Sequence, residues 1–334
     1  MQDFQDDKET YLLLILSDSN LPTGSFVASA GLESTATHAL FHARLPTSSD
    51  ASVAGTSASS DILAFLHNSV DTYACSALPF ARDAHRVSTA YANGEIAELD
   101  VALATLSRID ALYHASTLNH VARRASCSQG IALLTLYSKG FSRPPFLFTS
   151  TTGTTTSDDH GSLLDERERD RESRAGALVA AFKLRVRQGE SDDAPGHLPV
   201  CWGVLAGALG LDIGELEFFL IPHHHHRYAC QTHCYTHPDR GVHLHLFLHA
   251  RGVLSAAVRM NILGPYAAQQ LLLHAVKPLL CEAISSTAHL VSGALKGEFH
   301  PERLPAEQLP ATTWPLGEIL SARHDLLHSR IFNS

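Results

Sequence analysis

Apolar residues recur three or four positions apart along most of this chain, and the strict alternation that strands require is nearly absent. Leu63, Leu66, Val70 and Tyr73 mark one such face. The dominance of Leu and Ala also favours helices over strands. We therefore predict an all-α protein, a single helical-bundle domain over residues 9–334. Four long polar insertions, expected as loops or disordered segments, interrupt it at residues 46–60, 141–172, 188–197 and 222–241.

Two details refine this prediction. The charged run at residues 165–172 can also be read as the solvated start of a helix that ends near Arg187. Gly203 and Gly207 lie four positions apart in an apolar run, a spacing that allows two helices to pack closely.

The last twenty residues keep a helical rhythm where chain ends usually fray. The spacing predicts an amphipathic helix that continues to the last turn, with apolar positions at Leu316, Ile319, Leu320, Leu327 and Ile331. Its cations, Arg323, His324 and Arg330, would complement the helix dipole. Because the segment stops on the apolar pair Ile331-Phe332, it either packs on its own bundle or docks on another protein.

A second block lies near the other end of the chain. The apolar run from Tyr11 to Leu16 stops at the short polar residues 17–20, which compete for backbone hydrogen bonds. Pro22, Gly24 and Ser25 then predict a tight turn, and Gly31 opens another helix.

The block LSDS-x-LPTGSF-x-x-S-x-GLE and the terminus RHD-x-L-x-SR-x-FNS together resemble the UreF family of urease accessory proteins. The segment Arg251–Arg259, followed by Leu263–Gln270, resembles the same family. The resemblance covers about two thirds of the chain, and the long insertions are those of a eukaryotic, fungal type of member.

The resemblance implies a urease maturation chaperone that is not an enzyme and that forms a homodimer. It implies binding to the accessory protein UreD (UreH) and to the GTPase UreG, in a complex that delivers nickel to the urease apoprotein and gates GTP hydrolysis. No cofactor would be bound tightly, because nickel is handled by the complex. Matching the motifs assigns partner binding to Leu21, Pro22, Thr23, Gly24, Ser25, Phe26, Arg323, His324, Asp325, Arg330 and Phe332. It assigns dimer or helix-packing contacts to Gly252, Ser255, Ala256 and Arg259.

Composition points to the same class of protein. A formal net charge of −9 and a pI near 6.2 argue against a nucleic-acid partner, which needs a basic surface. Residues 1–10 are acidic and polar, without the basic start of a signal peptide. The longest apolar run, residues 198–211, is too short to cross a bilayer. We therefore expect a cytoplasmic protein that binds no membrane.

Nine of the 22 histidines lie between His223 and His249, and two cysteines lie among them. Imidazole and thiolate suit nickel or zinc, so this segment is either a metal site or an incidental insertion. The candidate ligands are His223, His224, His225, His226, Cys230, His233, Cys234 and His237. His245 and His249 share a helical face but have no carboxylate beside them, and we interpret them as polar positions on a helix surface.

Motifs for catalysis are weak. The chain contains no G-x-x-x-x-G-K-[ST] phosphate loop and no H-E-x-x-H motif, and the LPTGSF turn is not a hydrolase elbow. His324-Asp325 alone would suggest a metal hydrolase, but a histidine at a helix end beside a carboxylate explains the pair better. Two alternatives to the chaperone therefore stay open: a histidine-rich nickel-storage protein and, less favoured, a metal hydrolase.

Overall fold

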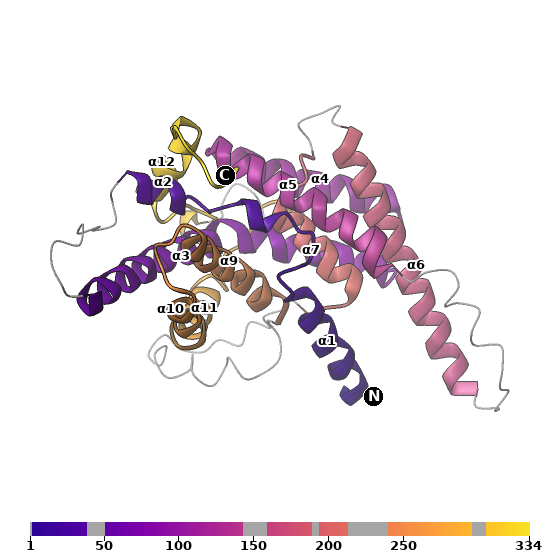
Figure 1. The fold of residues 1–334 in the computed structure, drawn as a ribbon. Coiled ribbons are helices and arrows are strands. Elements are labelled where there is room, and N and C mark those ends of the chain that lie inside the picture. The colour runs from indigo at the N-terminus through magenta and orange to yellow at the C-terminus, as the bar shows by residue number, and fades with distance from the viewer. Residues whose placement is uncertain (1, 39–50, 143–158, 189–193, 213–239, 296–304) are drawn as a thin grey trace.

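The computed structural model describes residues 2–38, 51–142, 159–188, 194–212, 240–295 and 305–334. Regular structure in these residues is helical, which confirms the all-α prediction, and the helices form a packed bundle (Figure 1). The helices are α1 (Gln2–Leu16), α2 (Leu32–Thr37), α3 (Ala51–Ala92), α4 (Leu99–Ser116), α5 (His120–Leu136), α6 (Asp159–Gln188), α7 (Leu198–Leu209), α9 (Arg240–Arg259), α10 (Pro265–Leu271), α11 (Lys277–Ser286) and α12 (Pro315–Ala322).

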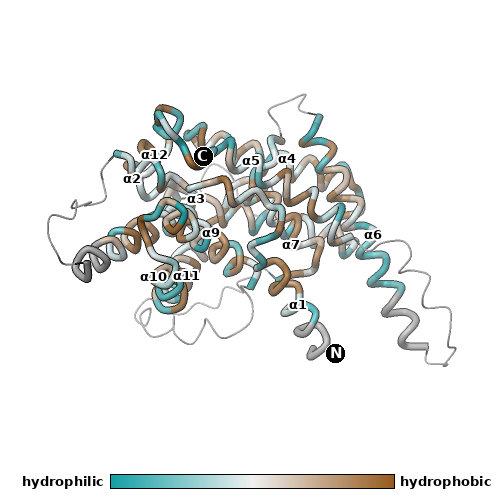
Figure 2. The backbone as a smooth tube through the Cα atoms, viewed as in Figure 1, coloured by the Kyte–Doolittle hydropathy of each residue, from teal (hydrophilic) through white to brown (hydrophobic). Residues whose placement is uncertain are grey.

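The core is built around α7, which is apolar on every side. All its residues from Pro199 to Ala208 are buried, as expected for a helix without a polar face. It packs most extensively on the long helix α3, and Figure 2 draws α7 largely in white to brown, whereas the colours of α3 are mixed. Gly203 and Gly207 make this contact possible. A Cβ atom on Gly203 would lie 2.3 Å from the Ala81 carbonyl oxygen, and one on Gly207 would lie 2.7 Å from Ser88 Cβ.

Two expected insertions are in part helical. Helix α3 already begins at Ala51, so the loop expected over 46–60 is wrong for residues 51–60. These residues include several alanines, the best helix formers, and small size alone does not break a helix. Helix α6 begins at Asp159, so the expected loop is also wrong for residues 159–164. The alternative reading of the charged run 165–172 as the start of a helix that ends near Arg187 is confirmed, since α6 ends at Gln188. Its Glu and Arg residues favour a solvated helix, and Glu168 accepts a hydrogen bond from Lys8 of α1 at 2.5 Å.

The other two expected insertions are only partly described. Residues 194–197 form a loop as expected, but it is packed rather than solvated: the Asp110 carboxylate accepts the backbone N–H groups of Gly196 and His197 at 2.6 and 2.9 Å. Most of 222–241 lies outside the described residues, except that Arg240 and Gly241 begin α9.

Within the described part of the chain, no helix combines the length and apolarity that crossing a membrane requires.

Candidate partner-binding junction

The N-terminal turn has the constrained geometry that its sequence predicts. Gly24 adopts a left-handed conformation with φ 73°, and the 3-10 turn Ser25–Val27 follows directly. Gly31, with φ 83°, precedes α2. A Cβ atom there would lie 3.0 Å from Ser321 Cβ, so Gly31 allows α2 to approach α12 closely.

The C-terminal segment, which we define as residues 323–334, lies against this turn. Helix α12 ends at Ala322, the 3-10 turn Arg323–Leu326 follows, and the remainder is not helical. The predicted helix to the last turn is therefore wrong. The physical reason is that the N–H groups of Ile331 and Phe332 are donated to Glu33 instead of to carbonyls within a helix.

Glu33 of α2 is the hub of this contact. Its side chain is almost fully buried and accepts hydrogen bonds from Ile331 N at 2.6 Å, from Phe332 N at 3.1 Å and from His324 Nε2 at 3.0 Å. Hydrogen bonds to a buried charged acceptor are stronger than neutral ones. One carboxylate thus binds two parts of the C-terminal segment to α2, the 3-10 turn through His324 and the chain end through Ile331 and Phe332.

Arg259 of α9 joins the two ends from the other side. Its guanidinium lies 3.6 Å from the ring centroid of Phe26 and 4.4 Å from that of Phe332, a double cation–π contact. It also donates a hydrogen bond to the Phe26 carbonyl oxygen. We call Phe26, Glu33, Arg259, His324 and Phe332 the junction.

An ion cluster lies at the surface beside the junction. Asp325 accepts two hydrogen bonds from Arg124 of α5, at 2.8 and 3.0 Å, and one from Arg330 at 3.0 Å. The hydrogen bonds from Arg124 hold the pKa of Asp325 well below its usual range. Arg124 also donates to the Asn333 carbonyl oxygen at 3.1 Å, so the cluster reaches the chain end.

The structure thus brings together the turn and the C-terminal residues to which the motifs assigned partner binding. Some of these residues are exposed to solvent, and others are buried. Phe26 is 64% exposed, and Arg330 also reaches solvent. His324 and Phe332 are 0% and 2% exposed. In the chain alone these two side chains pack on their own bundle, so any direct role in a complex belongs to their exposed neighbours.

Several exposed apolar side chains surround the junction. Leu326 and Ile331 of the C-terminal segment are 73% and 57% exposed, and Leu118 and Ile319 are 85% and 60% exposed. Of the apolar positions expected to form one helical face at the C-terminus, only Leu320 is buried. Sequence reasoning did not select Glu33, Leu118 or Arg124. Glu33 lies within the N-terminal block that resembles the family, whereas no motif or apolar spacing in the sequence identifies Leu118 or Arg124 as part of the site.

Three of the four residues assigned to dimer or helix packing, Gly252, Ser255 and Arg259, line one cavity. Ala256 is buried in the core, and Arg259 is also engaged at the junction. A Cβ atom on Gly252 would meet nothing within 4 Å.

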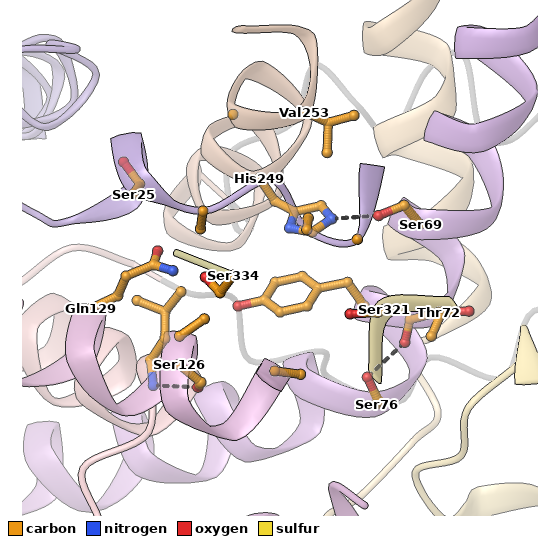
Figure 3. Close-up of a pocket in the computed structure, with 18 of the residues that line it drawn as sticks. Ser25, Ser69, Thr72, Ser76, Ser126, Gln129, His249, Val253, Ser321 and Ser334 are labelled. Carbon is orange, nitrogen blue, oxygen red and sulfur yellow. Dashed lines mark hydrogen bonds between the residues drawn. The ribbon is translucent and has the colours of Figure 1, made fainter. Parts of the chain in front are cut away.

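That cavity, of about 760 Å³, lies beneath the junction between α3, α5, α9 and α12. Figure 3 shows hydroxyl side chains from distant parts of the chain around it, including Ser25, Ser69, Ser126 and Ser321. Ser334, at the end of the C-terminal segment, lies at the same cavity. Phe26 and Arg259 of the junction contribute to the lining of this cavity, which is otherwise largely hydroxyl, apolar and aromatic.

His245 and His249 line this cavity. His245 is almost fully buried, so its interpretation as a surface position is wrong, whereas His249 is half-buried. His245 Nε2 is 3.0 Å from the Tyr73 hydroxyl, and His249 Nε2 is 2.9 Å from the Ser69 hydroxyl. Burial lowers the pKa of His245 to about 3 and that of His249 to about 4, so both imidazoles are neutral near pH 7. Their hydroxyl partners satisfy them without a charge, a pairing that helical spacing cannot reveal.

These lowered pKa values predict acid sensitivity. Between about pH 6.5 and pH 4 the unfolded state binds a proton at His249 that the native state does not, so the free energy of unfolding falls as pH falls. We expect His249→Gln, which keeps a polar partner for Ser69, to lose about 2 kcal/mol less than the parent between pH 6.5 and pH 4.5. Urea unfolding at both pH values measures this, and equal losses in the two proteins would contradict it.

No group of three or more His, Cys, Asp or Glu side chains in the described residues is arranged to hold a metal ion. The eight candidate ligands from His223 to His237 lie outside the described residues.

With this geometry in place, relatives of the chain can be compared. A family model for UreF matches residues 57–219 and 228–276. The chain is 36% identical over 351 residues to "Urease accessory protein 6" of Cryptococcus neoformans var. grubii, covering 98% of each protein. It is 28% identical over 330 residues to an "Uncharacterized urease accessory protein UreF-like" of Schizosaccharomyces pombe, covering 98% of this chain and 97% of that protein.

Proposed function

Because the chain belongs to the UreF family of urease accessory proteins, we propose that it is a non-catalytic chaperone that acts in urease maturation by binding other proteins through the junction and its rim. We propose as partners a UreD/UreH-like accessory protein and a UreG-like GTPase. Their complex would carry nickel, as cargo, to the urease apoprotein, and this chain would gate GTP hydrolysis.

The observation that carries this proposal is the gathering of exposed apolar side chains around the junction. Solvent-exposed apolar groups that cluster on one surface mark interaction sites more often than scattered ones do. Phe26, Leu118 and Ile319 line the rim of one cavity, and Ile331 follows from the C-terminal segment. The two sequence blocks that resemble the family most therefore meet at a surface where exposed apolar side chains gather.

The charges of this rim indicate the chemistry of the partner surface. Arg124, Arg323 and Arg330 lie around it, and Asp325 is shared between two of them. A partner that presents carboxylates around apolar side chains would complement this rim, although the chain as a whole is acidic. We propose that the UreD/UreH-like protein has such a surface.

A homodimer and a cytoplasmic location complete the proposal. The single exposed position among the residues assigned to dimer contacts is Ser255 of α9, so a dimer would need further residues. Sedimentation of the purified chain over a range of concentrations tests this part independently of the partners.

The binding surface is tested by a matched pair of variants. Ile331 beside the junction and Leu184 on α6 are each 57% exposed, so alanine at either position should leave the fold intact. We expect Ile331→Ala to weaken capture of the UreD/UreH-like partner about tenfold, because a buried aliphatic side chain contributes about 1.5–3 kcal/mol. Leu184→Ala should capture it as the parent does. Equal capture by all three proteins would contradict the assignment of the surface.

Nickel storage in the segment from His223 to His237 remains the second candidate, carried by its imidazoles and thiols. Deleting residues 222–241 separates the two functions. A maturation chaperone without this segment should still support active urease, whereas a storage protein should lose nickel capacity and function together. The metal hydrolase is not favoured, because His324 is fully buried and bonded to Glu33, out of reach of a substrate.

A further inference from the structure

Glu33 stands apart from the rest of the junction because it is buried and yet fixes the position of exposed residues. Its carboxylate is the acceptor for His324 Nε2 and for the N–H groups of Ile331 and Phe332. Ile331 and its neighbour Arg330 present their side chains to solvent. We infer that Glu33 is a positioning residue that holds the C-terminal segment against α2, with Ser334 at the cavity, and so presents the segment's exposed side chains to the partner, an inference that rests on the proposed function.

The arrangement of donors requires a carboxylate. All three groups that point at Glu33 are N–H donors: Oε1 accepts from Ile331, and Oε2 accepts from Phe332 and His324. Glutamine has nearly the same shape, but its amide has one acceptor oxygen and a donor NH₂ in place of the other. Glu33→Gln would therefore turn at least one of these hydrogen bonds into a contact between two donors, at a site that water does not reach.

The other polar attachments of the C-terminal segment are weaker or depend on the same geometry, and burial of the Phe332 ring adds an apolar one. The Asp325 cluster lies at the surface, where ion pairs stabilise little. Two backbone hydrogen bonds, from Asn333 N to the Val27 oxygen at 2.9 Å and from Ser29 N to the Ser334 oxygen at 2.6 Å, need the segment to lie in place already. Phe332 reaches the Arg259 guanidinium only when its own backbone is held.

The cavity provides a spectroscopic measure of whether the C-terminal segment lies in place. The chain has two tryptophans, Trp202 and Trp314, and both line the cavity. The C-terminal segment contributes Ser334 to the same lining. If the segment is released, solvent and a small neutral quencher reach the tryptophans more easily, although the helices that carry them stay folded.

Glu33→Gln and Asp325→Asn make a matched pair for the test, since each replaces one carboxylate that attaches the C-terminal segment to the bundle. Glu33 lies on α2, whereas Asp325 lies within the segment and binds Arg124 of α5. For each full-length variant we would measure acrylamide quenching of tryptophan fluorescence, helical circular dichroism, and affinity for the UreD/UreH-like partner. We expect Glu33→Gln to keep its helical signal, to raise the quenching constant at least about twofold, and to weaken partner binding about tenfold, equivalent to the loss of one strong hydrogen bond. Asp325→Asn should leave quenching unchanged.

A second variant, which lacks residues 331–334, keeps the test valid if Glu33→Gln misfolds. It removes the two residues whose N–H groups bind Glu33 and leaves Glu33 itself unchanged. It should show the same rise in quenching, and adding Glu33→Gln to it should raise quenching no further. Quenching that is unchanged in Glu33→Gln overturns the inference, and so does quenching that rises while partner binding stays at the parental level. Should Ile331→Ala weaken capture while Glu33→Gln leaves quenching unchanged, the inference fails and the proposed function stands. If neither Ile331→Ala nor Glu33→Gln alters capture, the proposed function fails.

Discussion

Replacing Gly203 with alanine should lower the free energy of unfolding by about 3 kcal/mol, a loss at the upper end of what overpacking a core causes. The added methyl group would lie 2.3 Å from the Ala81 carbonyl oxygen and 2.8 Å from Ala84 Cβ, atoms that belong to the backbone and the short side chains of α3. Neither neighbour can rotate away, so α3 and α7 would have to separate at the centre of the core. Urea unfolding followed by circular dichroism measures the change.

Gly252→Ala is the control for this prediction. Gly252 also lies inside a helix, but a Cβ atom there meets nothing within 4 Å. Alanine should therefore stabilise α9 by about 0.5–1 kcal/mol, because glycine loses more backbone entropy on folding. If both variants changed stability in the same direction, close helix packing would not be the reason for glycine at position 203.

Phe332→Ala should detach the C-terminal segment while the bundle stays folded. Phe332 is 2% exposed, and removing a buried phenylalanine costs about 3 kcal/mol or more. Because the segment can detach by itself, we expect the loss to appear as local opening and not as global unfolding. Partner capture should weaken about 100-fold, since a detached segment must be ordered again on binding.

Hydrogen exchange distinguishes these outcomes. Amides of residues 323–334 should exchange much faster in Phe332→Ala, whereas those of α7 should keep their protection. Leu326→Ala provides the comparison within the same segment, because Leu326 is 73% exposed and its loss should leave exchange unchanged. Faster exchange throughout α7 would mean that Phe332 belongs to the global core and that its loss says nothing specific about the junction.

The parts of the fold that follow from local chemistry could be predicted from the sequence. The all-α class followed from helical spacing, and the close contact of α7 followed from Gly203 and Gly207. The constrained turn at Gly24 followed from its Pro, Gly and Ser residues. Each of these depends on residues within a few positions of one another, over which sequence patterns are informative.

The misplaced elements have a common cause. Residues 51–60 and 159–164 lack the apolar spacing that marks a helix, so they were expected as loops, yet nothing in them stops a helix from extending. His245 and His249 were assigned to the surface because they are polar. Helical spacing predicts the face that the two histidines share. Only the folded structure shows that the hydroxyl groups of Tyr73 and Ser69 form hydrogen bonds with them.

The junction was predictable only in part. The motifs selected both chain ends as important, but no spacing rule states that Phe26 and Phe332 meet on one arginine, or that Glu33 fastens the C-terminal segment. Such contacts join residues up to 299 positions apart, and they depend on how the whole bundle packs.

The central claim is that this chain serves urease maturation by presenting the junction to other proteins. It is tested most directly by the nickel content and activity of urease purified from cells that produce only the Phe332→Ala variant, beside cells that produce the parent chain or none. We predict largely nickel-free, inactive urease in the variant and in the cells without the chain. Fully active, nickel-loaded urease from cells that lack the chain would contradict the account.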